Sequence, residues 1–350
     1  MKALKVTALA VMGLTTLTAC DPPIPQSILI SQAEQSFTSC ETGNLTVGFE
    51  DGFADLGLSW QQFLSGACAD MTFDTVGVTD QADIYLSSGA SKCEAFARVP
   101  VAFDAAAVVF YLDEAFAVNL SGATIAGIFS GEITSWDDPR IVADNPELPP
   151  VAVPINVLTQ APSSAIAAME SWASQISGSE ASFSLLQPAD DILFQDVIFG
   201  MQNGDVALMP LSAAQITGAT YAQVIVGEDP INDVVLADPL TAFAAATQFR
   251  VAEGEADLNI ALDFESSPLP QPGQNEADQP YQGLYPVMMD VCGEDNLLKR
   301  ALARYFLRLD AQGLIATSTV FALQSDIRIE AATVVGEGLP LPEITYTPEG

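Results

Sequence analysis

The sequence contains no histidine in its 350 residues. This absence excludes Ser-His-Asp triads, histidine metal sites and acid–base catalysis by imidazole. Positive charge is scarce as well, because 11 lysines and arginines stand against 45 aspartates and glutamates, which gives a formal net charge of −34. A protein that binds nucleic acid needs a basic surface. We therefore exclude nucleic acid as a partner, and we interpret the acidity first as a contribution to solubility.

The short motifs of common enzyme classes are also missing. The chain has no nucleophile elbow, Walker loop or GxGxxG turn, and no CxxC pair or other metal-ligand spacing. Adjacent carboxylates occur at residues 137–138 and 190–191, but neighbours in sequence do not share a helical face and do not indicate a glycosidase. We predict a protein that is not an enzyme and that uses no cofactor and no metal.

The first 20 residues have the pattern of a processing signal. Lys2 and Lys5 precede an apolar run over residues 6–17 that is too short to span a bilayer, and Leu17-Thr18-Ala19-Cys20 resembles the bacterial lipobox. We predict that residues 1–19 are a lipoprotein signal peptide, that Cys20 carries the lipid and that residues 20–40 form a tether. The protein would then lie on the periplasmic or other extracytoplasmic face of a membrane, anchored by its lipid. A plain secretory signal is the alternative.

Four further cysteines remain after such processing, at positions 40, 68, 93 and 292. Export brings a protein into an oxidising compartment, where an even number of cysteines indicates disulfides. Four cysteines allow three pairings, and the sequence does not decide between them. We favour Cys40–Cys68 and Cys93–Cys292.

The order of apolar patterns predicts an α/β protein with two lobes. Residues 44–49, 71–78 and 82–88 have the pattern of strands, with a helix after the first, and this β-α-β order predicts a parallel sheet whose carboxyl-end loops face a ligand. The long apolar run Arg98–Leu112 is interpreted as a strand that crosses from one domain core into another. Residues 119–141 follow as a helix that stops at the turn WDDP, residues 204–214 as strand material and residues 296–310 as a helix.

The chain returns to its starting lobe after a loop rich in proline and glycine. Residues 264–284 form this loop, and a strand beginning at residue 285 follows it. We therefore predict lobe 1 from residues 41–104 plus 285–350, and lobe 2 from residues 105–284. Two crossings between lobes produce a hinge and a cleft, which is a usual place for a small ligand.

Four segments in this order resemble a known family. They are VPVAFDAAAVVFY at 99–111, NLSGATIAGIFSGEITSWDDPRI at 119–141, PINVLTQAPSSA at 154–165 and YPVMMDV at 285–291. In order and spacing they resemble the phosphate-binding proteins of bacterial phosphate ABC transporters, and the resemblance extends over about residues 44–329. It implies a two-lobed type II periplasmic binding-protein fold with two parallel or mixed sheets. It also implies a small-molecule ligand, which can be phosphate or another oxyanion, and an ABC permease as partner.

The loops that would hold phosphate depart from the family pattern. Where the family has RSDGSGT, this chain has QAPSSAI, so that Gln160 replaces the arginine and Pro162 replaces the aspartate, while Ser164 remains. The turn after the first strand is Gly48-Phe49-Glu50-Asp51, and carboxylates at an anion site disfavour phosphate.

The acid of the family's Ser-Asp pair is also absent, because residues 87–88 are both serine. We predict ligand contacts from seven residues: Ser87, Ser88, Gly48, Gln160, Ser163, Ser164 and Arg98. For Arg98 the alternative is a surface or hinge salt bridge, and for the basic residues at 299, 300, 304 and 308 it is pairing with the protein's own acids instead of docking a permease or an anionic surface. The alternative for the whole protein is a scaffold or sensor that has lost phosphate binding.

The lipobox interpretation can be tested directly. Replacing Cys20 by alanine removes the thiol that accepts the lipid, so we expect the Cys20→Ala protein to remain soluble or uncleaved. Palmitate labelling of cells that express each form should mark the wild type alone. Equal labelling of the variant would refute the lipobox.

Overall fold

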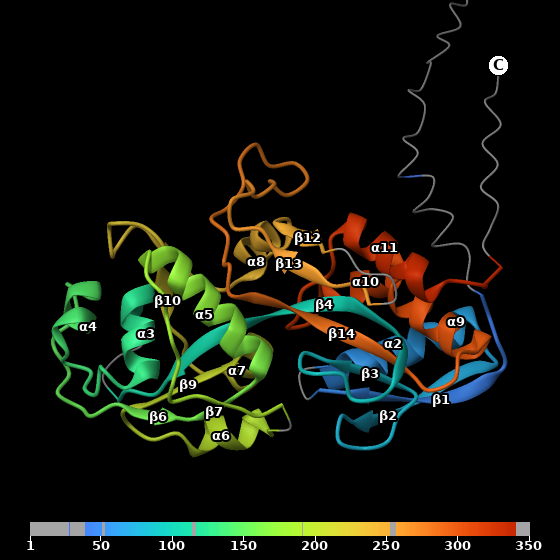
Figure 1. The fold of residues 1–350 in the computed structure, drawn as a ribbon, viewed down its shortest axis with the longest axis horizontal. Helices are drawn as coiled ribbons and strands as arrows, with labels where there is room; N and C mark the ends of the chain where they lie inside the picture. Colours follow the sequence, from blue (N-terminus) through green and yellow to red (C-terminus); the bar gives the residue numbers. More distant parts are fainter. Residues whose placement is uncertain are drawn as a thin grey trace, which may run out of the picture.

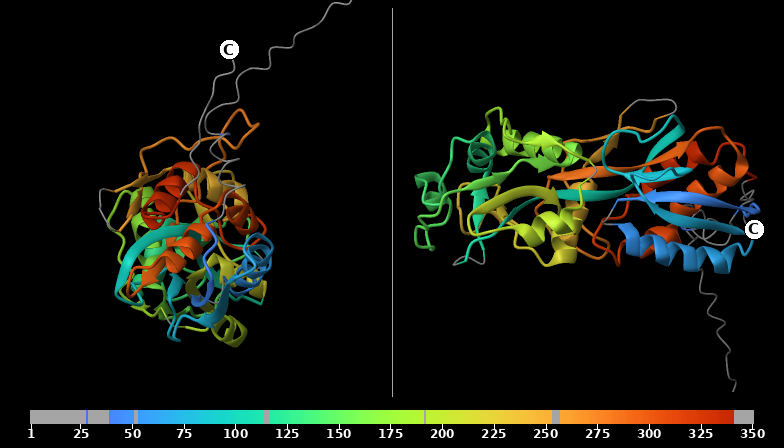
Figure 2. Two further views of the ribbon diagram at one scale, coloured as in Figure 1. Left: turned by 90° about the vertical axis from the view of Figure 1, so that its right-hand side faces the viewer. Right: turned by 90° about the horizontal axis from the view of Figure 1, so that it is seen from below.

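The computed structural model describes residues 28, 39–50, 53–113, 117–190, 192–252 and 257–340. The predicted signal peptide, Cys20 and most of the predicted tether therefore lie outside the described residues, as does Asp51. The helices and strands form two groups that lie along the long axis of the molecule and are joined by the strands β4 and β14 (Figures 1 and 2). We call the group that contains β1, β2 and β3 lobe 1, and the group that contains β6 and β9 lobe 2.

The central sheet has seven strands that continue from one lobe into the other. Their order is β2-β1-β3-β14-β4-β9-β6. Parallel pairs lie at both ends, since β1 is parallel to β2 and β3, and β6 is parallel to β9, whereas β14 is antiparallel to β3 and β4. The strands are β1 (Gly43–Phe49), β2 (Met71–Gly77), β3 (Ile84–Ser87), β4 (Ala95–Phe110), β6 (Asn156–Leu158), β9 (Asp205–Pro210) and β14 (Leu284–Cys292).

The strand β4 connects the two lobes, as the long apolar run predicted. It pairs with β14 as far as Ala105 and with β9 from Ala106 onward. Every residue from 99 to 110 is buried, because both faces of the strand are covered. Asp104 is the one charged residue within that buried run. The change of pairing partner at residues 105–106 lies close to the predicted lobe boundary, and the boundaries as drawn from the sequence stay a prediction.

Helices pack on the sheet of lobe 1 and bury its core. Trp60 of α2 is fully buried, donates from its indole Nε1 to the Ala311 carbonyl over 3.0 Å and lies 4.7 Å from the Phe306 ring, centroid to centroid. Residues far apart in the sequence thus share one core. The predicted helix over 296–310 is two helices, with a break after Phe306. The helices of this lobe are α2 (Ala54–Ala67), α9 (Leu297–Phe306), α10 (Leu309–Ile315) and α11 (Ser325–Val335).

In lobe 2 the prediction of one helix over residues 119–141 was wrong. The segment begins as a short strand, β5 (Asn119–Ser121), which pairs with β10, and only Gly122–Ser130 forms the helix α3. Ser121 begins this helix because its hydroxyl accepts from the Thr124 amide, and Gly131, at φ +82°, ends it before the WDDP turn is reached. Leu120, Ile125 and Phe129 are nevertheless buried.

The prediction of strand material over residues 204–214 was also wrong in its second half. The strand β9 ends at Pro210, and Leu211 begins the helix α7. The other elements of lobe 2 are α4 (Pro139–Asp144), α5 (Ser163–Ser177), α6 (Phe194–Gly200), α7 (Leu211–Thr217), β7 (Gln160–Ala161), β8 (Gln187–Pro188), β10 (Gln223–Ile225) and β11 (Val234–Val235).

A small unit lies beside the crossing strands. It consists of α8 (Pro239–Ala246) and the hairpin of β12 (Phe249–Val251) and β13 (Ile260–Leu262) (Figure 1). The Phe249 ring packs against Phe103 of β4 with centroids 4.5 Å apart. Residues 263–283 contain no helix or strand, as expected for the loop that precedes the return strand.

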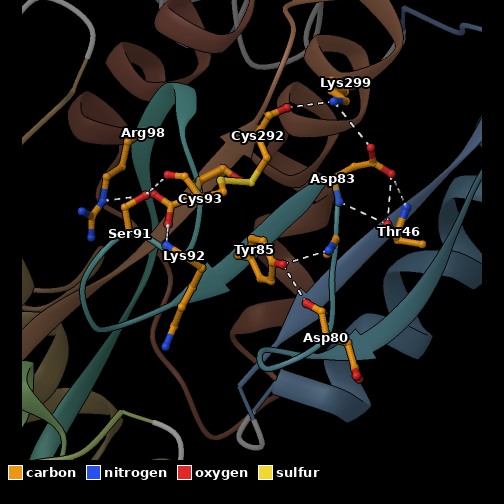
Figure 3. The surroundings of a disulfide bond; sticks show 12 residues. Thr46, Asp80, Asp83, Tyr85, Ser91, Lys92, Cys93, Arg98, Cys292 and Lys299 are labelled. Atoms are coloured by element: carbon orange, nitrogen blue, oxygen red, sulfur yellow. Dashed lines mark hydrogen bonds and ion pairs between the residues drawn. A yellow bond between two sulfur atoms is a disulfide. The ribbon is translucent and has the colours of Figure 1, made fainter.

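Two disulfides hold lobe 1, and they have the pairing favoured from the sequence. They join Cys40 to Cys68 and Cys93 to Cys292. The second bond fixes the loop after β3 against β14. Lys299 supports this junction, because its ammonium donates to the Cys292 carbonyl over 2.8 Å and lies 3.5 Å from the Asp83 carboxylate (Figure 3).

The contact between α3 and α5 depends on Gly122. A Cβ at this position would lie 2.6 Å from Cγ1 of Ile176 and 2.7 Å from the Ala173 carbonyl oxygen. We expect Gly122→Ala to lower the free energy of unfolding by about 1–3 kcal/mol, because the helices must separate. Gly66→Ala is the matched control, since nothing lies within 4 Å of the added atom, and it should raise helix stability by about 0.5–1 kcal/mol. Urea unfolding measures both, and equal effects would contradict the packing argument.

Candidate functional site

In lobe 1 the carboxyl ends of two parallel strands bring an acid and a serine together. Glu50 follows β1 and Ser88 follows β3, and the register pairs Phe49 with Leu86. One oxygen of the carboxylate, Oε1 of Glu50, accepts from the Ser88 amide at 2.7 Å and from the Ser88 hydroxyl at 3.0 Å. Both donors that Ser88 offers are therefore used by a carboxylate of the protein itself.

Lobe 2 repeats this arrangement with different elements. The two-residue strands β7 and β8 are parallel, Ser163 begins α5 directly after β7, and Asp190 follows β8. The Asp190 carboxylate accepts from the Ser163 amide at 2.9 Å and from the Ser163 hydroxyl at 3.0 Å. A negative charge at the first turn of a helix is favourable, because the unpaired amides there carry partial positive charge. Asp190 thus holds the position at the start of α5 that an anion would otherwise take.

The two arrangements face one cavity. It has a volume of about 110 Å³, and Glu50 and Ser88 of lobe 1 and Pro162 and Asp190 of lobe 2 line it. The lobes touch at its edge, because a Cβ placed on Gly89 would lie 2.5 Å from Oδ2 of Asp190. The rest of the wall is mainly apolar and includes Val78, Ile192, Leu193 and Phe194.

Burial alters the acidity of two carboxyl groups in this region. The pKa of Glu50 is raised to about 7, chiefly by burial, with a smaller contribution from the charge of Asp104 and an opposing one from the Ser88 hydrogen bonds. Burial also raises the pKa of Asp104 to about 7, although its Oδ2 accepts from the Ser212 hydroxyl at 2.5 Å and its Oδ1 from the Ser212 amide at 3.2 Å. Both groups therefore titrate near neutral pH.

A tyrosine hydroxyl lies among these acids without a partner. Tyr285 is 3% exposed, and its hydroxyl has no hydrogen-bond partner among the residues that the structure describes. The pKa of this hydroxyl is raised by burial and then by the charges of Asp104, Glu50 and Asp190, so it lies within electrostatic range of all three. An unsatisfied buried hydroxyl costs free energy, which makes this a place where a ligand would add a hydrogen bond.

Of the seven predicted ligand residues, Ser88 and Ser163 lie at this cavity. Ser88 lines it, and Ser163 binds Asp190 at its edge. The hydroxyls of Ser87 and Ser164 are buried and have no hydrogen-bond partner among the described residues. Ser164 also lines a wider groove of about 400 Å³ between α5 and the β12–β13 hairpin, together with Tyr285. Ligand contact by these serines stays a prediction.

The other three predicted ligand residues are placed differently. Gly48 packs against the Tyr85 ring, since a Cβ there would lie 2.6 Å from Cδ1. Gln160 is exposed on β7 and is not among the residues that line the cavity. The Arg98 guanidinium forms a salt bridge of 3.2 Å with the fully buried Asp290 and donates to the Gly89 carbonyl over 2.7 Å. Arg98 thus forms a salt bridge, as in the alternative given for it, but the partner is buried on the crossing strand β14 and is not at the surface.

Three of the four basic residues at 299, 300, 304 and 308 follow their alternative. Lys299 pairs with Asp83, Arg300 with Asp295 at 2.6 Å, and Arg308 with Asp310 at 2.7 Å. These ion pairs use the protein's own acids, so the stripe offers no observation in favour of a permease-docking surface.

Sequence reasoning missed Asp190, which lines the cavity, and the buried polar groups of Asp104 and Tyr285 on the crossing strands. Asp104 carried a signal, because a carboxylate inside an apolar strand is seldom buried without a reason. Asp190 was noted only as one of two adjacent acids, and no pattern connected it to Ser163. Within the described part of the chain, no group of three acidic or cysteine side chains is placed to hold a metal ion.

A family model described as a PBP superfamily domain matches residues 49–289, which is well over half of the 350 residues. The chain belongs to the PBP superfamily. Its two lobes, crossing strands and interlobe cavity are thus the features of a solute-binding architecture, and the two-lobed α/β fold implied by the sequence resemblance is confirmed.

This PBP superfamily chain is similar over short segments to curated phosphate-binding proteins. It is 40% identical over 61 residues to phosphate-binding protein PstS 3 of Mycobacterium leprae (strain TN), a match that spans 17% of this chain and 16% of that protein. It is 44% identical over 48 residues to phosphate-binding protein PstS 3 of Mycobacterium tuberculosis (strain ATCC 25618 / H37Rv), which spans 14% and 13%. The matched segments therefore cover less than a fifth of these relatives.

Two solved structures share the fold over most of the chain. One is a high-affinity periplasmic phosphate-binding protein called PfluDING, bound with phosphate, with a TM-score of 0.51, 16% identity and coverage of 87% of this chain and 100% of that one. The other is a human phosphate binding apolipoprotein, with a TM-score of 0.51, 14% identity and coverage of 83% and 94%. At these identities the likeness concerns the fold alone.

The raised pKa of Asp104 predicts an unusual dependence of stability on pH. In the unfolded chain a carboxyl titrates near pH 4, whereas the folded protein keeps the Asp104 proton up to a pKa of about 7. The folded state then binds more protons between these values, so this group makes the free energy of unfolding fall as pH rises from about 4 to 7. Asp104→Asn keeps the shape without the charge, because its Oδ1 can still accept from the Ser212 amide and its Nδ2 can donate to the Ser212 hydroxyl oxygen.

We expect Asp104→Asn to gain stability relative to the wild type between pH 5 and pH 8, by on the order of 1–3 kcal/mol. Urea unfolding at the two pH values measures this difference. Glu330→Gln, a change at an exposed residue of α11, is the control and should show no such gain. A stability difference for Asp104→Asn that is the same at both pH values would contradict the assignment.

Proposed function

We propose that the protein is an extracytoplasmic solute-binding protein that encloses a small ligand between its lobes and delivers it to an ABC permease. The observation that carries this proposal is the cavity itself, which is built from strand and helix ends of both lobes and contains polar groups from each. Membership of the PBP superfamily and the names of the similar proteins support it. Small-ligand sites are typically concave and mainly apolar, with a few convergent polar groups.

The anchoring lipid on Cys20 is part of the same proposal. Cys20 lies outside the described residues, and within those residues the structure has no helix that is long and apolar enough to cross a bilayer. A lipid would hold the protein beside its permease without such a helix.

A second candidate is a scaffold or sensor that has kept the fold and lost phosphate binding. The observation that favours it is the use of both the Ser88 and the Ser163 donors by carboxylates of the protein. The two candidates differ in whether any small molecule stabilises the closed lobes.

Contact between the lobes at Gly89 provides the test. The full chain is screened by thermal unfolding against phosphate, sulfate, amino acids, sugars and small amines, and a ligand of the cavity should raise the melting temperature. Gly89→Val should hold the lobes apart, because even a Cβ there lies 2.5 Å from Asp190. We expect this variant to weaken binding of the identified ligand at least tenfold by titration calorimetry.

Gly66→Ala, far from the cavity and with open space around the added atom, should bind as the wild type does. If no compound of the panel shifts the melting temperature, the scaffold interpretation is favoured. Binding that is unchanged in Gly89→Val would place the ligand outside the interlobe cavity.

A further inference from the structure

We infer that the ligand of the interlobe cavity carries a positively charged ammonium group. The carboxylates of Glu50 and Asp190 already accept the hydrogen bonds that an oxyanion would need. This inference rests on the proposed solute-binding function and specifies its ligand class. It assigns the site a chemistry opposite in charge to that of the phosphate-binding proteins that share the fold.

The first argument is that the donors are already used. An oxyanion is bound by amides at a helix start and by hydroxyls. Here the amide and hydroxyl of Ser88 donate to Glu50, and those of Ser163 donate to Asp190, over distances of 2.7–3.0 Å. A phosphate would have to displace both carboxylates and remain beside their charges, which costs several kcal/mol in a partly desolvated site.

The second argument is the charge of the cavity wall. Two carboxylates line it, and no lysine or arginine is among the lining residues that the structure describes. Arg98, after β3, is held by Asp290 and the Gly89 carbonyl, and the charge of Lys92 is the smallest of the influences on the pKa of Glu50. One lysine does not balance two carboxylates, so a ligand with positive charge supplies the compensation that remains.

The third argument is the second oxygen of the Glu50 carboxylate. Both Ser88 hydrogen bonds go to Oε1 of Glu50, whereas Oε2 accepts none from a described residue and therefore offers an acceptor to N–H groups. An ammonium has three donors and no acceptor, so it suits a site whose free groups are acceptors.

The size and the lining of the cavity narrow the class of ligand further. The cavity of about 110 Å³ is smaller than the engineered cavity of about 150 Å³ that holds benzene. Val78, Leu193 and Phe194 form an apolar side. The described residues offer no three-ligand group for a metal ion. A short alkylammonium therefore fits better than a metal cation, with the charged end at the carboxylates and the alkyl chain on the apolar wall.

The test uses three probes of similar or smaller size on the full chain at pH 7.5: butylammonium, butanol and inorganic phosphate. Titration calorimetry should show butylammonium binding in the millimolar range or tighter, with butanol and phosphate at least tenfold weaker. Butanol controls for the alkyl chain because it has the same number of heavy atoms and no charge. Phosphate or butanol binding as tight as butylammonium would overturn the inference.

Absence of binding by all three probes would also overturn the inference of an ammonium ligand. The proposed solute-binding function is then judged by the thermal-unfolding screen and by the Gly89→Val variant. A different solute that binds in that panel and weakens in Gly89→Val would leave the function standing without this ligand class.

Two double variants separate charge from geometry. Glu50→Ala with Asp190→Ala frees the four serine donors, so butylammonium affinity should fall at least tenfold and phosphate binding should become measurable. Glu50→Gln with Asp190→Asn keeps an acceptor oxygen and the side-chain size at both positions, so the fold should be retained. Its affinity for butylammonium should fall as much as that of the double alanine variant. Glu330→Gln is the control for removal of an acidic charge elsewhere. Unchanged butylammonium binding in the Gln/Asn variant would contradict a role for the charges.

Discussion

The pairing of β4 with β14 is the interaction on which both the fold and the site depend. These two strands pair from Leu284 opposite Ala105 to Cys292 opposite Ala95, and they connect the lobes. Their register places Tyr285 opposite Asp104, beside the point where β4 leaves β14 for β9. A shift of one residue would turn Asp104 to the other face of the sheet. Tyr285 and Asp104 lie opposite each other only because this register is kept.

Each lobe contributes to the cavity by the same local arrangement. A serine at the end of one parallel strand donates its amide and hydroxyl to a carboxylate at the end of the neighbouring strand, as Ser88 does to Glu50 and Ser163 to Asp190. The hydrogen bonds satisfy the backbone amides that strand and helix ends leave open. They also place carboxylates of both lobes at the wall of the interlobe cavity.

The sequence predicted those parts whose pattern is long enough to be specific. The crossing strand, the helix α2 and the strands of lobe 1 follow from apolar runs and helical spacing. The strand Asn119–Ser121 and the pair β7–β8 are only two or three residues long, so their pairing comes from the tertiary context. For the same reason Glu50 was recognised as an acid near the ligand loops, whereas Asp190 was not. The Arg98–Asp290 salt bridge depends on the register of β14, which no local pattern specifies.

The Cys93–Cys292 disulfide makes lobe 2 part of a covalent ring. Both crossing strands lie between these cysteines in the sequence, so the ring contains every element of lobe 2. Residues 263–283, which form no helix or strand, belong to it as well. A single cleavage of the backbone in that loop therefore leaves one molecule, in which β4 still joins the lobes from one side and the disulfide retains β14 from the other. Only cleavage together with reduction of the disulfide would divide the chain into separate pieces.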